Sequence, residues 1–203
     1  MPYPDRFYPV VDSVAWVARL AKLGAGTVQL RAKNLDATAA LAIVKDALAA
    51  TQGTQTKLVV NDYWRAAIDA GAKHVHLGQE DLADADVVAI RKAGITLGIS
   101  THDEDELDNA LLNSPNYIAL GPIFETTLKK MRFAPQGIER ITAWKLVIGD
   151  IPLVAIGGIK LEHAPQIFGA GANSIAVVSD ITMNADPDAR TRAWLDHTTE
   201  AAR

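Results

Sequence analysis

Short apolar runs alternate with longer segments of helical periodicity along the whole chain. Runs rich in Val, Ile and Leu, which are too short for helices, predict eight strands, over 7–11, 27–30, 58–60, 74–77, 96–99, 117–120, 153–156 and 174–178. Between and after them, amphipathic or alanine-rich segments predict helices over 14–23, 37–50, 64–70, 83–93, 103–112, 138–148, 161–170 and 188–201. Each strand is therefore followed by one helix.

The strand runs are continuously apolar rather than alternating between apolar and polar positions. Such runs are typical of a parallel sheet that helices cover. Eight repeats of strand and helix favour a closed (β/α)₈ TIM barrel over an open doubly wound sheet. At 203 residues the chain is short for a barrel, so its connections have to be short. No linker or low-complexity tract interrupts it, and we predict a single TIM-barrel catalytic domain over residues 1–203.

Composition narrows the class of protein without identifying it. The net charge is −4 and no block of Lys and Arg occurs, which argues against nucleic-acid binding. The chain has no cysteine, so disulfides, thiolate metal sites and a Cys nucleophile are excluded. No apolar run is long enough for a membrane span, and the first residues lack the pattern of a secretory signal. We expect a cytoplasmic protein with small-molecule partners, and the sequence allows a homo-oligomer without specifying one.

The segment 57–81 predicts a strand, a helix and a second strand. A unit this short has parallel strands and a right-handed crossover, so Asp62 and Asp81, which follow the two strands, lie at the same edge of the sheet. Ligands bind at that edge in α/β folds. Two neighbouring carboxylates suit Mg²⁺, which is often held by one or two carboxylates together with waters and substrate phosphates. The alternative is that each aspartate caps the helix that follows it.

Polar and basic side chains also gather after the other predicted strands. They are Gln29, Arg31 and Lys33; Asn61; Ser100, Thr101 and His102; Thr126, Thr127, Lys129 and Lys130; Gly157 and Gly158; and Val178 and Ser179. Basic side chains at this edge of an acidic protein indicate a pocket for an anionic ligand.

Two anion sites are predicted from these residues. The loops with Gly157, Gly158 and Ser179 fit the monophosphate site of TIM barrels, although the two glycines also suit a plain tight turn. Arg31 and Lys129, with Lys33 and a metal on the aspartates, carry enough positive charge for a pyrophosphate. For each lysine alone, solvated surface is the alternative.

The histidines point less clearly to a function. His74 and His76 are two residues apart in one predicted strand, so they lie on the same face. Because His74 is far from the carboxyl end of the strand, we favour a packing role for the pair. His102 follows the fifth strand and is a candidate for supporting the site without touching a ligand.

Seven segments occur in a characteristic order: VQLRAKN, VVNDYWRAAI, VHLGQEDL, LGISTHD, YIALGPIF, VAIGGI and SIAVVS. As a set, from about residue 8 to 182, they resemble the thiamine-phosphate synthases, especially the enterobacterial-type members. That family consists of (β/α)₈-barrel transferases of thiamine biosynthesis. The resemblance implies that the protein couples 4-amino-2-methyl-5-hydroxymethylpyrimidine pyrophosphate with thiazole phosphate, releases pyrophosphate and uses Mg²⁺.

The resemblance also implies roles for individual residues. The pyrimidine pyrophosphate would be bound by Gln29, Leu30, Arg31, Ala32, Lys33, Asn61, Ser100 and Lys129. The thiazole phosphate would be bound by Thr126, Thr127, Leu128, Gly158, Val178 and Ser179. Asp62 and Asp81 would bind Mg²⁺. Arg31, Lys129 and Ser100 would be catalytic, in a dissociative substitution that forms a pyrimidine-stabilised cation and needs no protein nucleophile.

The chain departs from the family pattern after the segment GPIF. The family usually reads Pro-Thr-x-Thr-Lys there, whereas this chain reads Glu125-Thr126-Thr127-Leu128-Lys129. Leu128 has no hydroxyl for the thiazole phosphate, and Glu125 adds a negative charge, so both substitutions predict weaker binding of that substrate. Two alternative functions remain: a thiazole tautomerase-like enzyme, which would not need the aspartate pair, and a non-catalytic phosphate-ligand binder of the same fold.

Overall fold

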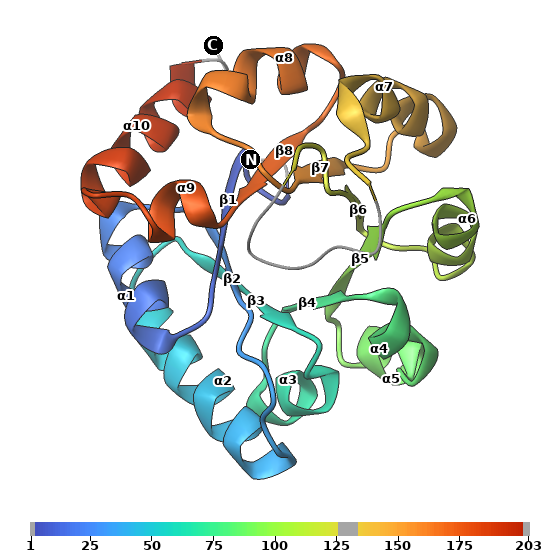
Figure 1. The fold of residues 1–203 in the computed structure, drawn as a ribbon. Helices are drawn as coiled ribbons and strands as arrows, with labels where there is room; N and C mark the ends of the chain where they lie inside the picture. The colour runs from blue at the N-terminus through green and yellow to red at the C-terminus, as the bar shows by residue number, and fades with distance from the viewer. Residues whose placement is uncertain (1–2, 126–133, 201–203) are drawn as a thin grey trace.

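Eight parallel strands close into a barrel in the order of the sequence, and helices surround the barrel (Figure 1). The structure is a computed structural model that describes residues 3–125 and 134–200. The strands are β1 (Phe7–Val11), β2 (Thr27–Leu30), β3 (Lys57–Asn61), β4 (His74–Leu77), β5 (Thr96–Thr101), β6 (Tyr117–Leu120), β7 (Leu153–Ile156) and β8 (Ser174–Val177). Because β8 pairs with β1, no edge strand remains, and the predicted (β/α)₈ barrel is confirmed.

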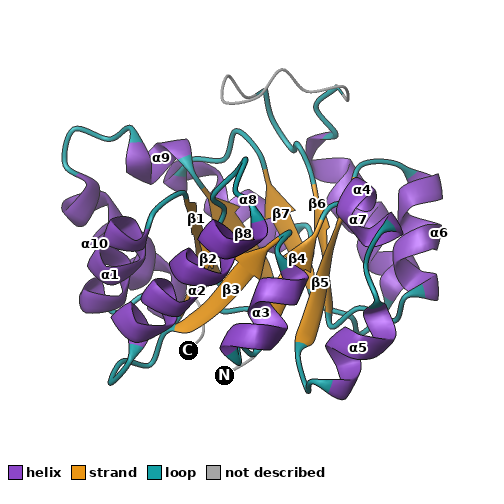
Figure 2. Cartoon of the chain, turned by 90° about the horizontal axis from the view of Figure 1, so that it is seen from below, coloured by secondary structure: helices purple, strands orange, loops and turns teal. Residues whose placement is uncertain are grey.

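The helices pack on the outside of the strands, as the side view also shows (Figure 2). They are α1 (Val14–Leu23), α2 (Ala37–Thr51), α3 (Trp64–Ala70), α4 (Gln79–Ala83), α5 (Val87–Lys92), α6 (Glu104–Leu112), α7 (Gly137–Ile148), α8 (Ala164–Gly169), α9 (Ser179–Thr182) and α10 (Pro187–Glu200), with a 3₁₀ helix, η1 (Leu161–His163), before α8. None of the helices in the described ranges has the length and apolar character needed to cross a membrane.

Two of the predicted helices are divided in the structure. The single helix expected over 83–93 is wrong, because the chain forms α4, turns, and starts α5 at a new cap in which the Asp86 carboxylate accepts from the Ala89 amide at 2.8 Å. The helix expected over 161–170 begins as η1 and continues as α8. The helix α9 was not predicted, because four residues are too few to show a helical period.

Strand side chains alternate between the helices and the barrel interior. Val28, Leu58 and Ile118 face outward and are almost fully buried against the helices, where each contributes about 1.5–3 kcal/mol of hydrophobic stabilisation. The interior holds a smaller apolar cluster, of which Tyr8 and Tyr117 are the largest members. Polar inward-facing residues lie above this cluster, toward the carboxyl ends of the strands, and they form the floor of a cavity.

Candidate active site

A cavity of about 810 Å³ lies at the carboxyl ends of the barrel strands. All eight strands contribute to its lining, and so do the residues that directly follow them, such as Asp12, Arg31 and Asp62. The volume suits a small-molecule ligand. TIM-barrel enzymes have their active sites at this end.

The cavity brings together most of the residues predicted to bind pyrimidine pyrophosphate and metal. Those that line it are Gln29, Arg31, Lys33, Asn61, Asp62, Asp81 and Ser100. Leu30 and Ala32 alternate in sequence with Gln29, Arg31 and Lys33, and they do not line the cavity. The Leu30 side chain packs between the sheet and the helices. Thr126, Thr127, Leu128 and Lys129, the other predicted residues of this edge, lie outside the described residues.

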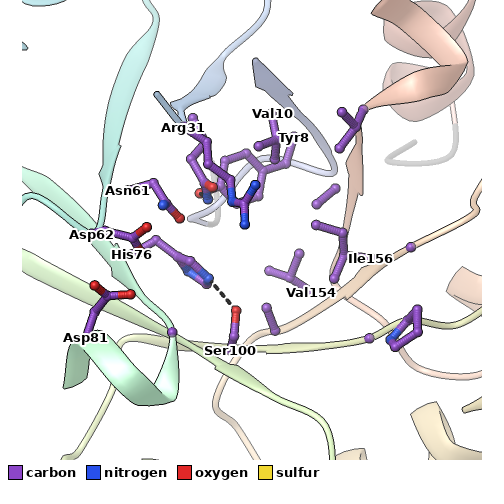
Figure 3. A pocket seen from close by; sticks show the side chains of 18 of the residues that line it. Tyr8, Val10, Arg31, Asn61, Asp62, His76, Asp81, Ser100, Val154 and Ile156 are labelled. Carbon is purple, nitrogen blue, oxygen red and sulfur yellow. Dashed lines mark hydrogen bonds between the residues drawn. The ribbon is translucent and has the colours of Figure 1, made fainter. Parts of the chain in front are cut away.

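Asp62 and Asp81 lie on one side of the cavity, and the guanidinium group of Arg31 extends into it (Figure 3). Burial, the charge of Asp81 and a hydrogen bond with Asp81 raise the pKa of Asp62 to about 6, against an ordinary value of 3.8. Lys33 and Arg31 act in the opposite direction but do not cancel these effects. Two carboxyl groups that disfavour each other's charge form a site that a cation would stabilise.

The structure argues against helix capping as the role of Asp62. The cap residue of α3 is Tyr63, and Asp62 itself has a left-handed backbone with φ of 66°. Aspartate is one of the few residues other than glycine that adopt this conformation, which turns the chain sharply after β3. Asp81 is in the first turn of α4, after the cap residue Gly78, where the helix dipole favours a carboxylate.

The donor set fits Mg²⁺ better than a metal that needs a complete protein cage. In the described ranges, no three His, Cys, Asp or Glu side chains converge as metal ligands, so Asp62 and Asp81 offer a two-carboxylate site. Mg²⁺ is commonly held by one or two carboxylates, with waters and substrate phosphates as the remaining ligands. Structural Zn²⁺ and Ca²⁺ sites need more protein ligands than this pair supplies.

His76 is a cavity residue whose position the sequence did not reveal. Its Nε2 lies 2.8 Å from the Ser100 hydroxyl, and its Nδ1 lies 2.9 Å from the Tyr117 hydroxyl (Figure 3 draws the first contact). Burial and then the charge of Arg31 lower the pKa of His76 to about 3, so the ring is neutral at physiological pH. Period-two alternation carried a usable signal, because it places His76 and Ser100 on the inner faces of successive strands.

His74 and His102 have other surroundings. The His74 ring stacks on Tyr3, with 4.5 Å between the ring centroids, and its Nδ1 lies 2.6 Å from the Thr96 hydroxyl, in keeping with the predicted packing role. His102 lines the cavity, and its Nδ1 lies 2.6 Å from a carboxylate oxygen of Glu106.

A second cavity, of about 320 Å³, adjoins the first. It is lined by Gly158 and Ser179, whose chain neighbours Gly157 and Val178 line the larger cavity. The short helix α9 begins at Ser179, as in the phosphate site built from the last two loops of a TIM barrel. Glu125 lines the same cavity, so its negative charge lies beside the predicted phosphate site.

Only glycine fits at position 158, beside the second cavity. Its φ is +66°, and a Cβ atom at this position would lie 2.3 Å from the carbonyl oxygen of Glu125. The loop after β7 therefore packs directly against the backbone that follows β6. The tight turn and the phosphate site are compatible interpretations, because the turn brings this backbone to the cavity.

The fold and the two cavities define a class of protein. A closed (β/α)₈ barrel has a carboxylate pair facing basic side chains, with a glycine-lined cavity next to it, all at the carboxyl ends of the strands. These are the features of a TIM-barrel enzyme that acts on phosphorylated small molecules.

Comparison with known proteins identifies the family. The family model described as "Thiamine monophosphate synthase" matches residues 7–181. The chain is 53% identical over 191 residues to a thiamine-phosphate synthase of Rhizobium etli, covering 94% of each chain. It is 49% identical over 197 residues to one of Cronobacter sakazakii, covering 96% of this chain and 94% of the relative. The chain therefore belongs to the thiamine monophosphate synthase family, and the resemblance predicted from its segments is confirmed.

A solved structure supports the same assignment. The thiamine phosphate pyrophosphorylase from Pyrococcus furiosus is 25% identical to this chain, with a TM-score of 0.84. The match covers 98% of this chain and 97% of that structure. The likeness therefore extends over the barrel and its connections.

Proposed function

We propose that the protein carries out the reaction of its family in the larger cavity. It couples 4-amino-2-methyl-5-hydroxymethylpyrimidine pyrophosphate with thiazole phosphate, giving thiamine phosphate and pyrophosphate. The observation that carries this proposal is the pair Asp62 and Asp81, which faces Arg31 and Lys33 in a cavity of substrate size. The two carboxylates would bind Mg²⁺, and the basic side chains would bind the diphosphate. The cavity therefore has a partner for each charge of a magnesium diphosphate.

The basic side chains act on the departing pyrophosphate. As the carbon–oxygen bond to the pyrimidine breaks, negative charge grows on the diphosphate oxygens. Arg31 offers a planar set of donors that suits two phosphate oxygens at once, and Lys33 adds a second positive charge. Asp62 and Asp81 would hold Mg²⁺, which supplies further neutralisation of the leaving group when bound.

Polar groups on the cavity floor orient the same substrate. The Nδ2 atom of Asn61 is buried and has no hydrogen-bond partner among residues 3–125 and 134–200, so it is available to an acceptor on a ligand. Ser100 lines the same cavity and offers a hydroxyl. A buried donor left without a partner costs about 1–3 kcal/mol, which a bound substrate would recover.

Apolar side chains cover the other side of the cavity. Val10, Val154 and Ile156 lie across from the carboxylates (Figure 3). A pyrimidine cation formed by loss of pyrophosphate would react with any water beside it. An apolar wall excludes that water and leaves the thiazole nitrogen as the available nucleophile.

The thiazole phosphate is assigned to the adjoining cavity. Gly158, Val178 and Ser179 would hold its phosphate, together with Thr126, Thr127 and Leu128, to which the family resemblance assigns the same role. This arrangement places the two substrates in neighbouring cavities, with the thiazole ring at the boundary between them. Glu125 lines the phosphate cavity, and we expect it to weaken binding of this substrate.

One assay separates the proposed reaction from its alternatives. Pyrophosphate release is measured with both substrates, with and without MgCl₂. Release that needs both substrates and Mg²⁺ is the expected result. A thiazole tautomerase would act without the pyrimidine substrate and would be insensitive to a chelator. A non-catalytic binder would bind pyrimidine pyrophosphate in calorimetry yet release no pyrophosphate.

The assigned residues give a second test of the proposal. Asp62→Ala and Lys129→Ala should each lower kcat by at least about 10²-fold, the scale seen when one charge-stabilising group is removed. Lys92→Ala, at an exposed position of α5, is the control for loss of a lysine and should leave kcat unchanged. Near-normal turnover of either site variant would refute its assigned role.

A further inference from the structure

A continuous chain of side-chain hydrogen bonds crosses the barrel interior at the floor of the cavity. Nε2 of Gln29 donates to the Tyr8 hydroxyl at 2.7 Å, and this hydroxyl lies 2.9 Å from that of Tyr117. The Tyr117 hydroxyl lies 2.9 Å from Nδ1 of His76, whose Nε2 lies 2.8 Å from the Ser100 hydroxyl. We call these five residues the relay. Four of its members, Gln29, Tyr8, His76 and Ser100, line the cavity.

The members of the relay are held in position by packing. The rings of His76 and Tyr117 stack with 5.5 Å between centroids and 19° between planes. Gly98 makes room for the Tyr117 ring, since a Cβ atom at residue 98 would lie 2.0 Å from its Cζ. Tyr8 and Tyr117 are 1% and 0% exposed, so their rings are fixed by the surrounding side chains.

The direction of the hydrogen bonds along the relay decides whether Ser100 is a donor or an acceptor toward the cavity. A tyrosine hydroxyl has one hydrogen, and an imidazole enclosed by neutral hydroxyl groups carries a single N–H. We take the polarity in which each hydroxyl passes its one hydrogen onward from Gln29: Tyr8 donates to Tyr117, and Tyr117 donates to Nδ1 of His76. The hydrogen of His76 is then on Nε2 and is donated to Ser100. The hydrogen of the Ser100 hydroxyl is left free to point into the cavity.

We propose that the relay holds Ser100 as a hydrogen-bond donor toward an anionic oxygen of the bound substrate, with Tyr117 and His76 as positioning residues. The inference rests on the proposed function in taking pyrimidine pyrophosphate as that substrate. With the opposite polarity, the Ser100 hydrogen would be used on His76, and its oxygen lone pairs would face the substrate's negative charge. The relay thus makes a freely rotating hydroxyl directional without placing a charge in the interior.

The tautomer of His76 tests the relay without any substrate. In ¹⁵N-correlated NMR spectra of the free protein, we expect a neutral ring protonated at Nε2 and unprotonated at Nδ1. The signal is assigned by its loss in His76→Gln, and the ring of His197 on α10 serves as a reference. A ring protonated at Nδ1 would overturn the proposal. The tautomer is measured without substrate, so it tests the relay separately from the reaction. A protein that released no pyrophosphate would refute only the proposed function.

A double-mutant cycle tests what the relay does for the reaction. Tyr117→Phe should lower kcat/KM for pyrimidine pyrophosphate about tenfold, the scale of one hydrogen bond to a charged group, and leave the KM for thiazole phosphate unchanged. In the Ser100→Ala background, the same change should have less than about a twofold effect, because the hydroxyl that it orients is gone. Equal losses in both backgrounds would show a merely structural role and overturn the proposal.

Two further variants keep this test decisive. Tyr3→Phe is the matched control, because the Tyr3 ring packs edge-on against Tyr117 at 5.7 Å but its hydroxyl is not a member of the relay. Its kcat/KM should stay within about twofold of the wild-type value. If Tyr117→Phe does not fold, Tyr8→Phe removes the neighbouring hydroxyl of the relay. Its effect on kcat/KM should likewise be smaller in the Ser100→Ala background than in the wild type. Additive losses for Tyr8→Phe would count against the relay.

Discussion

At the residue scale, the carboxyl group of Asp62 is held in surroundings that oppose its charge. It is partly buried, and it faces the carboxyl group of Asp81. Because its pKa is raised to about 6, this group favours the folded state only while it is protonated. Its contribution is full below its ordinary pKa of 3.8 and is lost as pH rises through about 6. At neutral pH the metal-free protein therefore carries a local cost at its proposed metal site.

Asp62→Asn should separate stability from function. We expect the metal-free variant to be more stable than wild type by about 1–2 kcal/mol at pH 7.5, after allowing for solvent screening, and the difference to disappear near pH 4. Asn is a suitable replacement because it tolerates a left-handed backbone. Denaturant unfolding at both pH values measures the difference. A variant less stable than wild type at pH 7.5 would contradict this account of Asp62.

At the scale of elements, one carboxylate joins the segments around the second cavity. Asp180, in α9, accepts hydrogen bonds from Arg190 Nε at 2.8 Å and Nη2, from Trp194 Nε1 at 2.8 Å and from the Leu161 amide at 3.3 Å. Its side chain is 7% exposed. The carboxylate thereby holds α9, α10 and η1 together behind Ser179. None of these contacts involves a neighbour in sequence, so local propensity could not reveal them.

Asp180→Asn should destabilise the protein by about 2 kcal/mol, because it removes the buried partner of Arg190 and leaves that guanidinium only the exposed Glu162. It should also raise the KM for thiazole phosphate, since Ser179 loses its support. The matched control is Asp188→Asn, which removes the exposed ion pair with Arg19 and should cost less than about 0.5 kcal/mol. Thermal unfolding and steady-state kinetics measure both effects. Equal destabilisation by the two variants would refute the role given to Asp180.

At the scale of the whole molecule, closure of the barrel creates the site. Gln29 and Ser100 lie on β2 and β5 and meet the same cavity only because the eight strands close on themselves. The carboxylates and basic groups of the cavity are likewise brought together from separate strand ends. Cation and diphosphate should therefore bind together and stabilise the whole fold.

MgCl₂ and pyrophosphate together should raise the melting temperature more than the sum of their separate effects. At about 100 times the dissociation constant, a ligand stabilises by about 2.7 kcal/mol, and about 2–4 °C per kcal/mol applies to a chain of this size. Differential scanning calorimetry of the wild type, with Asp62→Asn as control, measures the synergy. Synergy of the same size in the variant would argue against Asp62 as a metal ligand.

Much of the site could be predicted because functional side chains in a parallel barrel lie at the carboxyl ends of the strands. Arg31, Asn61, Asp62 and Ser100 come directly after or at the end of apolar runs, and parallel strands bring such positions to one edge. His76 was assigned to packing because the sequence does not show its partners on neighbouring strands. The roles of individual residues, a cytoplasmic location and a homo-oligomer stay predictions.

The sequence by itself determined the eight-fold alternation, the parallel barrel and the family, because these depend on local periodicity and on short segments in order. Tertiary structure alone decided other contacts: the bond from His76 to Ser100, the bond from Trp194 to Asp180, and the space that Gly98 leaves for Tyr117. Such contacts join residues far apart in the chain. They depend on strand register and barrel closure, which set distances that no local pattern encodes.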